Sequence, residues 1–379
     1  MRLERPVPAD VLGAIQAPFL AMSATMLDVP ILQPLGLLLD LAGETLRERL
    51  FVVQGDGPEA CLRPDFTIPA LRAHLATGAA TGRYVYSGHA FQVAARGFDR
   101  AEEFPEIGVE AFETGDRPEA DAEMAALAWR AAGAGGRHDL TLIMDDVALF
   151  GDFVDALGVA PPVAARLKRA FSTPRRLRAE IEAAGGDVTS ARTVDGGRLA
   201  ALLSGLSESD ATGVLEEIWS LAGVEPVGGR SAAEIVHRLA GRAALAAAPR
   251  LTPEQAELTR RFLAIAGDPA ESLAAVGALV GGRSASLAAA AESWRRRISA
   301  MVAAGVPASR IRFSAAFGRA FGYYDGVLFE IRSAALGDDQ PVAAGGRYDG
   351  LPARLGAALA TGAVGCMVRP GRAWVGGTP

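Results

Sequence analysis

The chain has 379 residues, of which 50% are hydrophobic and 22% charged, so it is expected to be globular and long enough for two or three domains. Its formal net charge of −6 offers no basic excess and predicts no nucleic-acid partner. Neither the two cysteines, Cys61 and Cys366, nor the four histidines show metal-ligand spacing such as C-x-x-C, so no structural metal is expected.

The N-terminus and the hydropathy of the chain bear on where the protein resides. The opening MRLERPVPAD lacks the apolar core of a signal peptide, and no apolar run reaches the length of a membrane span. Two lone cysteines are typical of a reducing compartment. These features predict a cytoplasmic protein with no membrane partner.

The first 150 residues alternate between helical and strand-like patterns. The expected elements are a helix over 9–25, a strand over 51–54, a helix over 68–75, strands over 83–87 and 107–112, a helix over 120–132 and a strand over 139–145. Two-residue alternation in the strand over 107–112 places Glu110 on the face opposite Val109 and Ala111. Strands joined mostly through Gly/Pro turns favour an α+β fold with a largely antiparallel sheet.

The composition of the chain changes after Phe150. From there to about Gly305 nearly every residue is Ala, Leu, Arg or Glu at helical spacing, with breaks at glycines and prolines. This pattern predicts a mainly helical insertion over residues 151–305. The insertion divides a core formed by residues 1–150 and 306–379.

The segment 316–351 has the richest chemistry in the chain. It is expected to hold one strand over Tyr323–Ile331 and another that ends at Val342–Ala344 and runs into Gly345-Gly346. Paired glycines there suggest a strand end where backbone or ligand approaches closely, because a Cβ would obstruct it. The polar residues around them are Arg319, Tyr323, Tyr324, Arg347 and Tyr348. Such residues fit a small zwitterionic ligand, whereas the alternative interpretation is a simple turn with half-buried tyrosines.

Four motifs in a fixed order carry a family resemblance. They are LRPDFTIPALRAHL (62–75), EEFPEIGVEAF (102–112), GRAFGYYDGVLFEI (318–331) and AAGGRYDGL (343–351). Together they resemble the catalytic core of class II histidyl-tRNA synthetases. They are even more similar to its paralogue, the family of ATP phosphoribosyltransferase regulatory subunits. The resemblance covers roughly residues 5–150 and 310–370 and implies a class II synthetase-like core, in which a mostly antiparallel sheet is flanked by helices.

The resemblance also implies a histidine pocket. The implied ligand-binding residues are Asp65, Thr67, Gln92, Glu106, Glu110, Arg319, Tyr323, Tyr324 and Tyr348. By motif, Asp65 and Thr67 align with the residues that hold the amino group of histidine in the synthetases. Glu106 and Glu110 align with the two residues that contact the amino group and the imidazole. Arg319 falls near the carboxylate, and Tyr324 and Tyr348 fall on tyrosines beside the ring. The residue types agree, since carboxylates pair with ammonium and imidazole N–H groups and arginine with a carboxylate.

The chain departs from the synthetase pattern at several positions. Gln92 falls where a synthetase places the motif 2 arginine on the ATP α-phosphate, and an uncharged amide stabilises a phosphate poorly. Glu106 replaces the usual glutamine, and the sequence around Arg369 matches motif 3 poorly. Roughly thirty residues follow GGRYDG, too few for an anticodon-binding domain, since independent domains need roughly 50 residues or more.

The resemblance therefore implies a regulatory subunit that is not itself an enzyme. Its implied partner is the short catalytic ATP phosphoribosyltransferase subunit, which joins ATP and phosphoribosyl pyrophosphate in the first step of histidine biosynthesis. The chain would activate that subunit and bind histidine as the allosteric feedback inhibitor. In the family the two chains form a hetero-octamer. No cofactor is expected, because no Walker A motif occurs and the glycines of GAVGCMV lack a strand-to-helix frame.

The segment 31–53 fits the motif 1-like region that builds the dimer interface in the family. We expect a homodimer face there that buries Ile31, Leu35, Leu38 and Leu39, because together they would leave a large apolar surface in water. Two other functions stay open. A truncated histidyl-tRNA synthetase predicts histidine-dependent ATP–pyrophosphate exchange and a tRNA partner, and a free-standing histidine-binding module needs no catalytic partner.

Overall fold

The computed structural model describes residues 4, 6–55, 57–94, 100–113, 115–184, 206–222, 231–233, 235–237, 249–282, 284–317, 322–357 and 362–376. The chain forms two compact units. The first comprises Met1–Ala156, Phe171–Thr173 and Arg261–Pro379, and the second comprises Leu157–Ala170 and Pro174–Arg260. The second unit is thus narrower than the expected insertion over 151–305, and residues 261–305 belong to the first unit.

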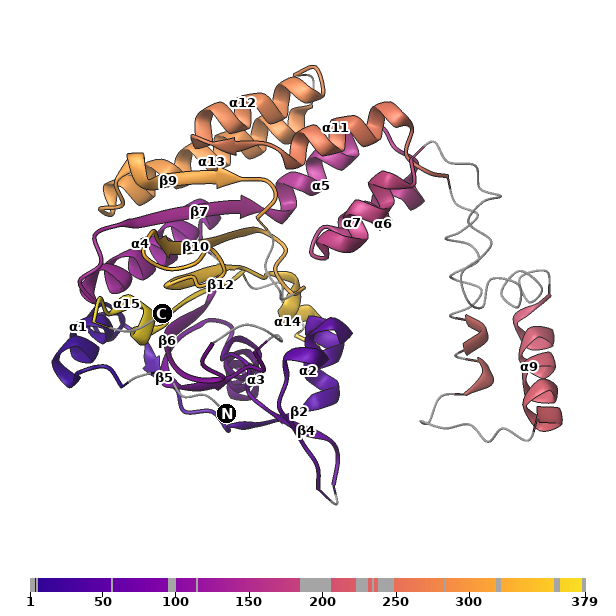
Figure 1. Cartoon of the computed structure of the whole chain (residues 1–379), viewed down its shortest axis with the longest axis horizontal. Coiled ribbons are helices and arrows are strands. Elements are labelled where there is room, and N and C mark those ends of the chain that lie inside the picture. The colour runs from indigo at the N-terminus through magenta and orange to yellow at the C-terminus, as the bar shows by residue number, and fades with distance from the viewer. Residues whose placement is uncertain are drawn as a thin grey trace. The chain divides into compact units, whose positions relative to one another are not determined.

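A large sheet forms the centre of the first unit (Figure 1). In the described part of the chain its strand order is β1-β5-β6-β12-β11-β10-β7-β9-β8. The strands are β1 (Thr25–Met26), β5 (Gly82–Phe91), β6 (Glu103–Glu113), β7 (Leu140–Asp146), β8 (Ala266–Gly267), β9 (Ile311–Ser314), β10 (Val327–Ser333), β11 (Ala343–Arg347) and β12 (Gly362–Val368). Neighbours pair antiparallel except β1 with β5 and β7 with β9, which confirms the expected largely antiparallel sheet.

Helices cover both faces of this sheet. They are α1 (Ala9–Leu20), α2 (Leu35–Ala42), α3 (Thr67–Thr77), α4 (Arg117–Ala134), α5 (Val147–Ala156), α12 (Pro269–Leu279), α13 (Ala285–Ala303), α14 (Gly350–Arg354) and α15 (Pro370–Ala373). α4 packs against β11, β12, α1 and α13, and α12 packs against β8 and β9. These contacts explain why α12 and α13 belong to the first unit and not to the insertion.

Local sequence signals account for the start of α4. Asp116 precedes the helix, and its side chain accepts a hydrogen bond from the backbone N–H of Glu119 at 3.2 Å. Pro118 occupies the first turn, where its missing N–H has no helical partner to lose. This helix is longer than the expected range 120–132 because its capping residues lie before the apolar pattern begins.

The second unit is described through its helices, which are α6 (Pro161–Ala170), α7 (Pro174–Glu182), α9 (Glu208–Ala222) and most of α11 (Pro253–Leu263). Arg166 of α6 donates to Glu180 of α7 at 3.1 Å. Ala211 and Leu215 of α9 pack with Ala232 and Val236 in a separate small core. No helix in the described part of the chain is both long and apolar enough to cross a membrane.

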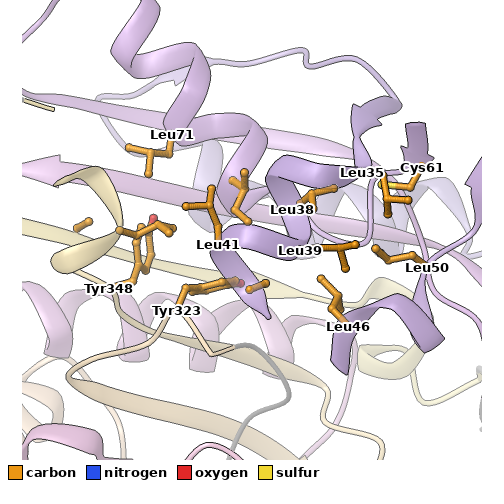
Figure 2. Close-up of a cluster of buried hydrophobic side chains, with 14 of the residues drawn as sticks. Leu35, Leu38, Leu39, Leu41, Leu46, Leu50, Cys61, Leu71, Tyr323 and Tyr348 are labelled. Atoms are coloured by element: carbon orange, nitrogen blue, oxygen red, sulfur yellow. The ribbon is translucent and has the colours of Figure 1, made fainter. Parts of the chain in front are cut away.

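A leucine-rich cluster lies beside a small sheet in the first unit (Figure 2). That sheet has the order β2 (Leu32–Pro34), β4 (Ala60–Leu62) and β3 (Val52–Val53). Leu35, Leu38 and Leu39 are each at most 5% exposed, because they pack against this chain's own tyrosines and leucines. The expectation that these leucines need a second subunit to cover them was therefore wrong, whereas Ile31 is 46% exposed.

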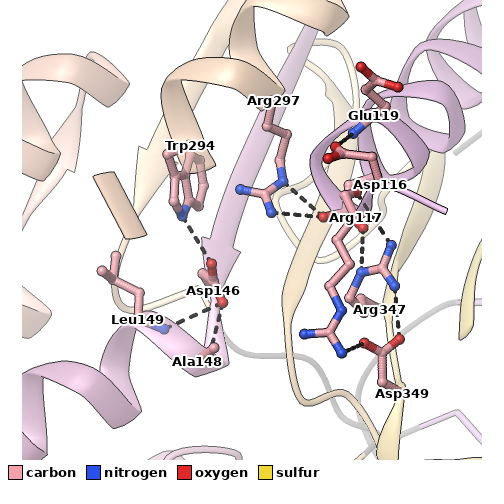
Figure 3. Close-up of polar contacts among 11 residues, drawn as sticks. Asp116, Arg117, Glu119, Asp146, Ala148, Leu149, Trp294, Arg297, Arg347 and Asp349 are labelled. Carbon is pink, nitrogen blue, oxygen red and sulfur yellow. Dashed lines mark hydrogen bonds and ion pairs between the residues drawn. The ribbon is translucent and has the colours of Figure 1, made fainter. Parts of the chain in front are cut away.

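A buried ion-pair network fastens two helices to the sheet (Figure 3). Asp121 of α4 accepts hydrogen bonds from Arg347 Nε of β11 at 2.7 Å and from Arg297 Nε of α13 at 2.9 Å. All three side chains are almost completely buried. Arg347 also donates to Asp349 at 2.8 Å. The guanidinium groups of Arg297 and Arg347 are thus buried next to a carboxylate that offsets the cost of their desolvation.

We predict that Asp121→Asn lowers the free energy of unfolding by about 3–5 kcal/mol, since it leaves buried guanidinium groups without a counter-charge. Urea denaturation measures the loss. Asp116→Asn is the matched control, because Asp116 also pairs with an arginine, Arg296, at 2.8 Å but on the exposed surface. Asparagine keeps the helix cap there, so a much smaller loss is expected. Equal losses in the two variants would contradict the importance of the buried network.

Candidate functional site

A pocket of ≈ 950 Å³ lies in the first unit. It is lined by seven of the residues singled out from the sequence, namely Asp65, Thr67, Gln92, Glu106, Glu110, Tyr323 and Tyr324. Tyr348 contacts the pocket through Glu110, to which its hydroxyl donates a hydrogen bond. Arg319 lies outside the described residues. Four segments that are far apart in the sequence are thus brought to one place.

The register of the central strands decides which face of the sheet carries the pocket. Glu110 of β6 pairs with Gly365 of β12, and Gly365 pairs with Gly346 of β11. Arg347, the residue after Gly346, donates a hydrogen bond to Asp121 of α4. Because successive side chains alternate between faces, Glu110 lies on the face opposite α4.

Glycines make room for the side chains above this face. A Cβ on Gly365 would lie 1.8 Å from Glu110 Oε2, and one on Gly346 would lie 2.8 Å from the Tyr324 ring. Gly345 and Gly346 were expected just after the end of a strand, but they lie inside β11. The groups that approach them closely belong to the protein itself.

Glu110 is held from both of its oxygens. Thr67 Oγ1 donates to Oε1 at 2.8 Å, and the Tyr348 hydroxyl donates to Oε2. Burial raises the pKa of Glu110 to about 8, although these two hydrogen bonds act to lower it. At neutral pH this carboxyl group is therefore mostly protonated, and it can exchange a proton with a bound imidazole.

Asp65 lies beside Glu110 at the start of α3. The Tyr323 hydroxyl donates to Asp65 Oδ2 at 3.3 Å, and the backbone N–H of Thr67 donates to Oδ1 at 3.1 Å. The ring of Tyr348 stands edge-on to those of Tyr323 and Tyr324, at centroid distances of 6.0 and 6.2 Å. Tyr323 and Tyr324 thus present their rings to the pocket beside the carboxylate of Asp65, with the Tyr348 ring behind them.

Glu106 and Gln92 line a further part of the pocket. Glu106 is buried, and the Tyr86 hydroxyl donates to it at 3.5 Å. Gln92 accepts a hydrogen bond from Arg49 Nη2 at 2.6 Å and donates to the Pro64 carbonyl at 2.8 Å. The amide of Gln92 is therefore engaged by its neighbours.

Positive charge also lines the pocket, and sequence reasoning missed most of it. The arginines concerned are Arg49, Arg100, Arg332, Arg369 and Arg372, of which only Arg369 was singled out from the sequence. Burial lowers the pKa of Arg369 and Arg372. Tyr86 was missed as well, although alternation along β5 could have placed it on the pocket face. The arginines are scattered along the chain, so no local spacing marks them as a group.

The pocket offers both carboxyl and guanidinium groups to a ligand. Carboxyl groups of Asp65, Glu106 and Glu110 can receive an ammonium group and ring N–H groups. Guanidinium groups elsewhere on the wall can receive a carboxylate. Among the described residues, no cluster of histidine, cysteine, aspartate and glutamate side chains could hold a metal ion.

The raised pKa of Glu110 makes stability depend on pH. The folded state keeps the proton up to about pH 8, while the unfolded chain loses it near pH 4.5. The ligand-free protein should therefore lose up to about 4 kcal/mol of unfolding free energy as the pH rises between these values. Denaturation of the wild type and of Glu110→Gln across pH 5–8 measures this. The variant should show a flatter profile, and identical slopes would rule out the shifted pKa.

Comparison with known proteins places the chain in a family. A family model described as histidyl-tRNA synthetase matches residues 25–209 and 210–369. An ATP phosphoribosyltransferase regulatory subunit from Mesorhizobium japonicum is 37% identical over 361 residues, and one from Brucella anthropi is 32% identical over 356 residues; each match covers 92% of both chains.

A crystal structure from Bacillus halodurans, titled ATP phosphoribosyltransferase regulatory subunit/histidyl-tRNA synthetase, superposes with a TM-score of 0.61. The match covers 100% of this chain and 82% of that one, and at 18% identity it supports the fold alone. The fold is thus the expected class II synthetase-like core. On the sequence matches, the chain belongs to the histidyl-tRNA-synthetase-like family of ATP phosphoribosyltransferase regulatory subunits.

Proposed function

We propose that this chain is the regulatory subunit of an ATP phosphoribosyltransferase, the enzyme of the first step of histidine biosynthesis. The observation that carries the proposal is the identity of 32–37% to regulatory subunits over about nine-tenths of the chain. Its partner is a short catalytic subunit, which this chain activates. The chain itself performs no phosphoribosyl transfer.

The pocket supports a ligand-binding role in place of synthetase chemistry. An aminoacylating site must stabilise the charged phosphates of ATP with preorganised positive charge. Here Gln92 stands at the motif 2 position, and the nearby Arg49 donates to its amide oxygen. A synthetase-like core that keeps amino-acid recognition without phosphate activation is suited to sensing an amino acid.

Histidine is the effector that the pocket fits best. Its imidazole would lie beside Glu110, with its ammonium group near Asp65 and Glu106 and its ring among the tyrosines. Arg319 would take the carboxylate in this arrangement. Feedback inhibition then follows from linkage, since histidine that binds the inactive state of the complex more tightly draws the complex toward that state.

Exposed apolar residues on the small sheet support a homodimer within a hetero-octamer with the catalytic chains. Ile31 and Leu32, at the start of β2, and Val52 and Val53 of β3 are between 37% and 54% exposed. Together they offer an apolar surface of the kind that a second subunit covers. The proposed dimer face therefore rests on these residues and not on the leucines of α2.

We predict that the wild-type chain sediments as a dimer at micromolar concentration and that Val52→Asp weakens the dimer at least ten-fold, because a charge in a dry interface loses its hydration. Val302→Asp is the matched control, since Val302 is 41% exposed and Val52 40%. The control should leave the dimer intact. A wild-type monomer, or equal weakening by both variants, would contradict the proposed face.

The function itself is tested with the short catalytic subunit from the same genome. Adding this chain should stimulate phosphoribosyl transfer to ATP, and histidine should then inhibit the complex. Glu110→Gln should preserve stimulation but raise the half-inhibitory histidine concentration roughly ten-fold or more, since a buried polar partner is altered. Glu180→Gln, in the second unit, is the control and should behave as the wild type.

One result would overturn the proposed function, and a second would overturn only the histidine site. Absence of stimulation, together with histidine-dependent ATP–pyrophosphate exchange by this chain alone, would indicate a synthetase. Stimulation with unchanged histidine inhibition in Glu110→Gln would preserve the regulatory role but place histidine elsewhere.

A further inference from the structure

A second charged cluster adjoins the pocket where β6, β12 and α15 meet. Arg369 lines the pocket directly after β12, and its Nη2 lies 3.4 Å from Glu4 Oε1. The two side chains are only 8% and 10% exposed. The guanidinium group of Arg369 also lies over the Phe104 ring, 3.4 Å from its centroid. A carboxylate from the start of the chain thus meets a pocket arginine in a nearly dry environment.

Glu4 is held in place by the backbone and by a glycine. Its N–H donates to the Glu103 carbonyl at 3.2 Å, which anchors it beside the first residue of β6. A Cβ on Gly371 would lie 2.5 Å from the carboxyl carbon of Glu4. Only a glycine at the start of α15 therefore lets the carboxylate lie this close.

The carboxylate acts on more than one pocket arginine. Burial is the main cause of the lowered pKa of Arg372, the charge of Arg369 lowers it further, and Glu4 acts to raise it. Glu4 also acts to raise the pKa of Arg369. The neighbouring guanidinium groups therefore repel each other, and Glu4 offsets that repulsion from within the protein.

We propose that Glu4 is a specificity-determining residue that neutralises the arginine end of the pocket, so that the pocket takes a free zwitterionic amino acid and rejects ligands bearing phosphate groups. Guanidinium groups bind phosphate in bidentate fashion when they are available. With a fixed carboxylate already beside them, an incoming phosphate meets a like charge and gains little. The inference rests on the pocket proposed above as the amino-acid site, although its test does not depend on histidine.

Isothermal titration with inorganic pyrophosphate tests the proposal on the full chain. The wild type should bind pyrophosphate weakly, and Glu4→Gln should bind it at least ten-fold more tightly. Asp10→Asn is the control, because it removes the same charge from an exposed site on α1. Adding Arg369→Gln to Glu4→Gln should abolish the gain. If Glu4→Gln binds no more tightly than Asp10→Asn, or the wild type already binds as tightly, the proposal is wrong.

Gly371→Ala provides a second route that leaves Glu4 itself unchanged. The added methyl group should displace the carboxylate and produce a similar gain in pyrophosphate affinity. A gain in neither variant overturns the role of Glu4. Titration with histidine separates the two proposals, because a pyrophosphate gain without any histidine binding would overturn the proposed effector site and leave the role of Glu4 standing.

Discussion

The carboxylate of Asp121 joins segments that lie far apart in the sequence. It meets Arg347 on β11 and Arg297 on α13, so one buried group ties α4, the sheet and the last long helix together. Tyr348 follows Arg347 directly and donates to Glu110. The interaction that secures the fold on one face of the sheet therefore also sets the position of the hydroxyl that bonds to Glu110 on the other face.

The pocket itself is a balance of buried charges. Glu110 keeps its proton because burial raises its pKa, so one carboxyl group there is neutral when the ligand is absent. Among the positively charged groups, Arg369 lies next to the carboxylate of Glu4, and Arg49 donates a hydrogen bond to the amide of Gln92. The proposed amino-acid site thus has several of its arginines already next to acceptors of the same chain, in a core whose relatives are named both as synthetases and as regulatory subunits.

Much of the pocket could be predicted because its residues sit in contiguous motifs. Asp65 and Thr67 share one motif, Glu106 and Glu110 another, and the tyrosine pair a third, and the structure brings all of them to one pocket. The arginines around them could not be predicted as a group. They come from separate segments, and no periodicity relates them. The second compact unit is also narrower than the helical segment expected from the sequence, since the apolar pattern of α13 is helical whether the helix packs on α4 or elsewhere.

The sequence by itself determined most helices and strands of the first 150 residues, the largely antiparallel character of the sheet and the family, because these follow from local alternation, turn residues and ordered motifs. Only the tertiary structure decided what covers each apolar and charged group. Leu35, Leu38 and Leu39 are buried inside their own chain, and Glu4 meets an arginine 365 positions away. Burial and pairing of this kind depend on contacts between distant segments, and they set the pKa values and the charge that a ligand encounters.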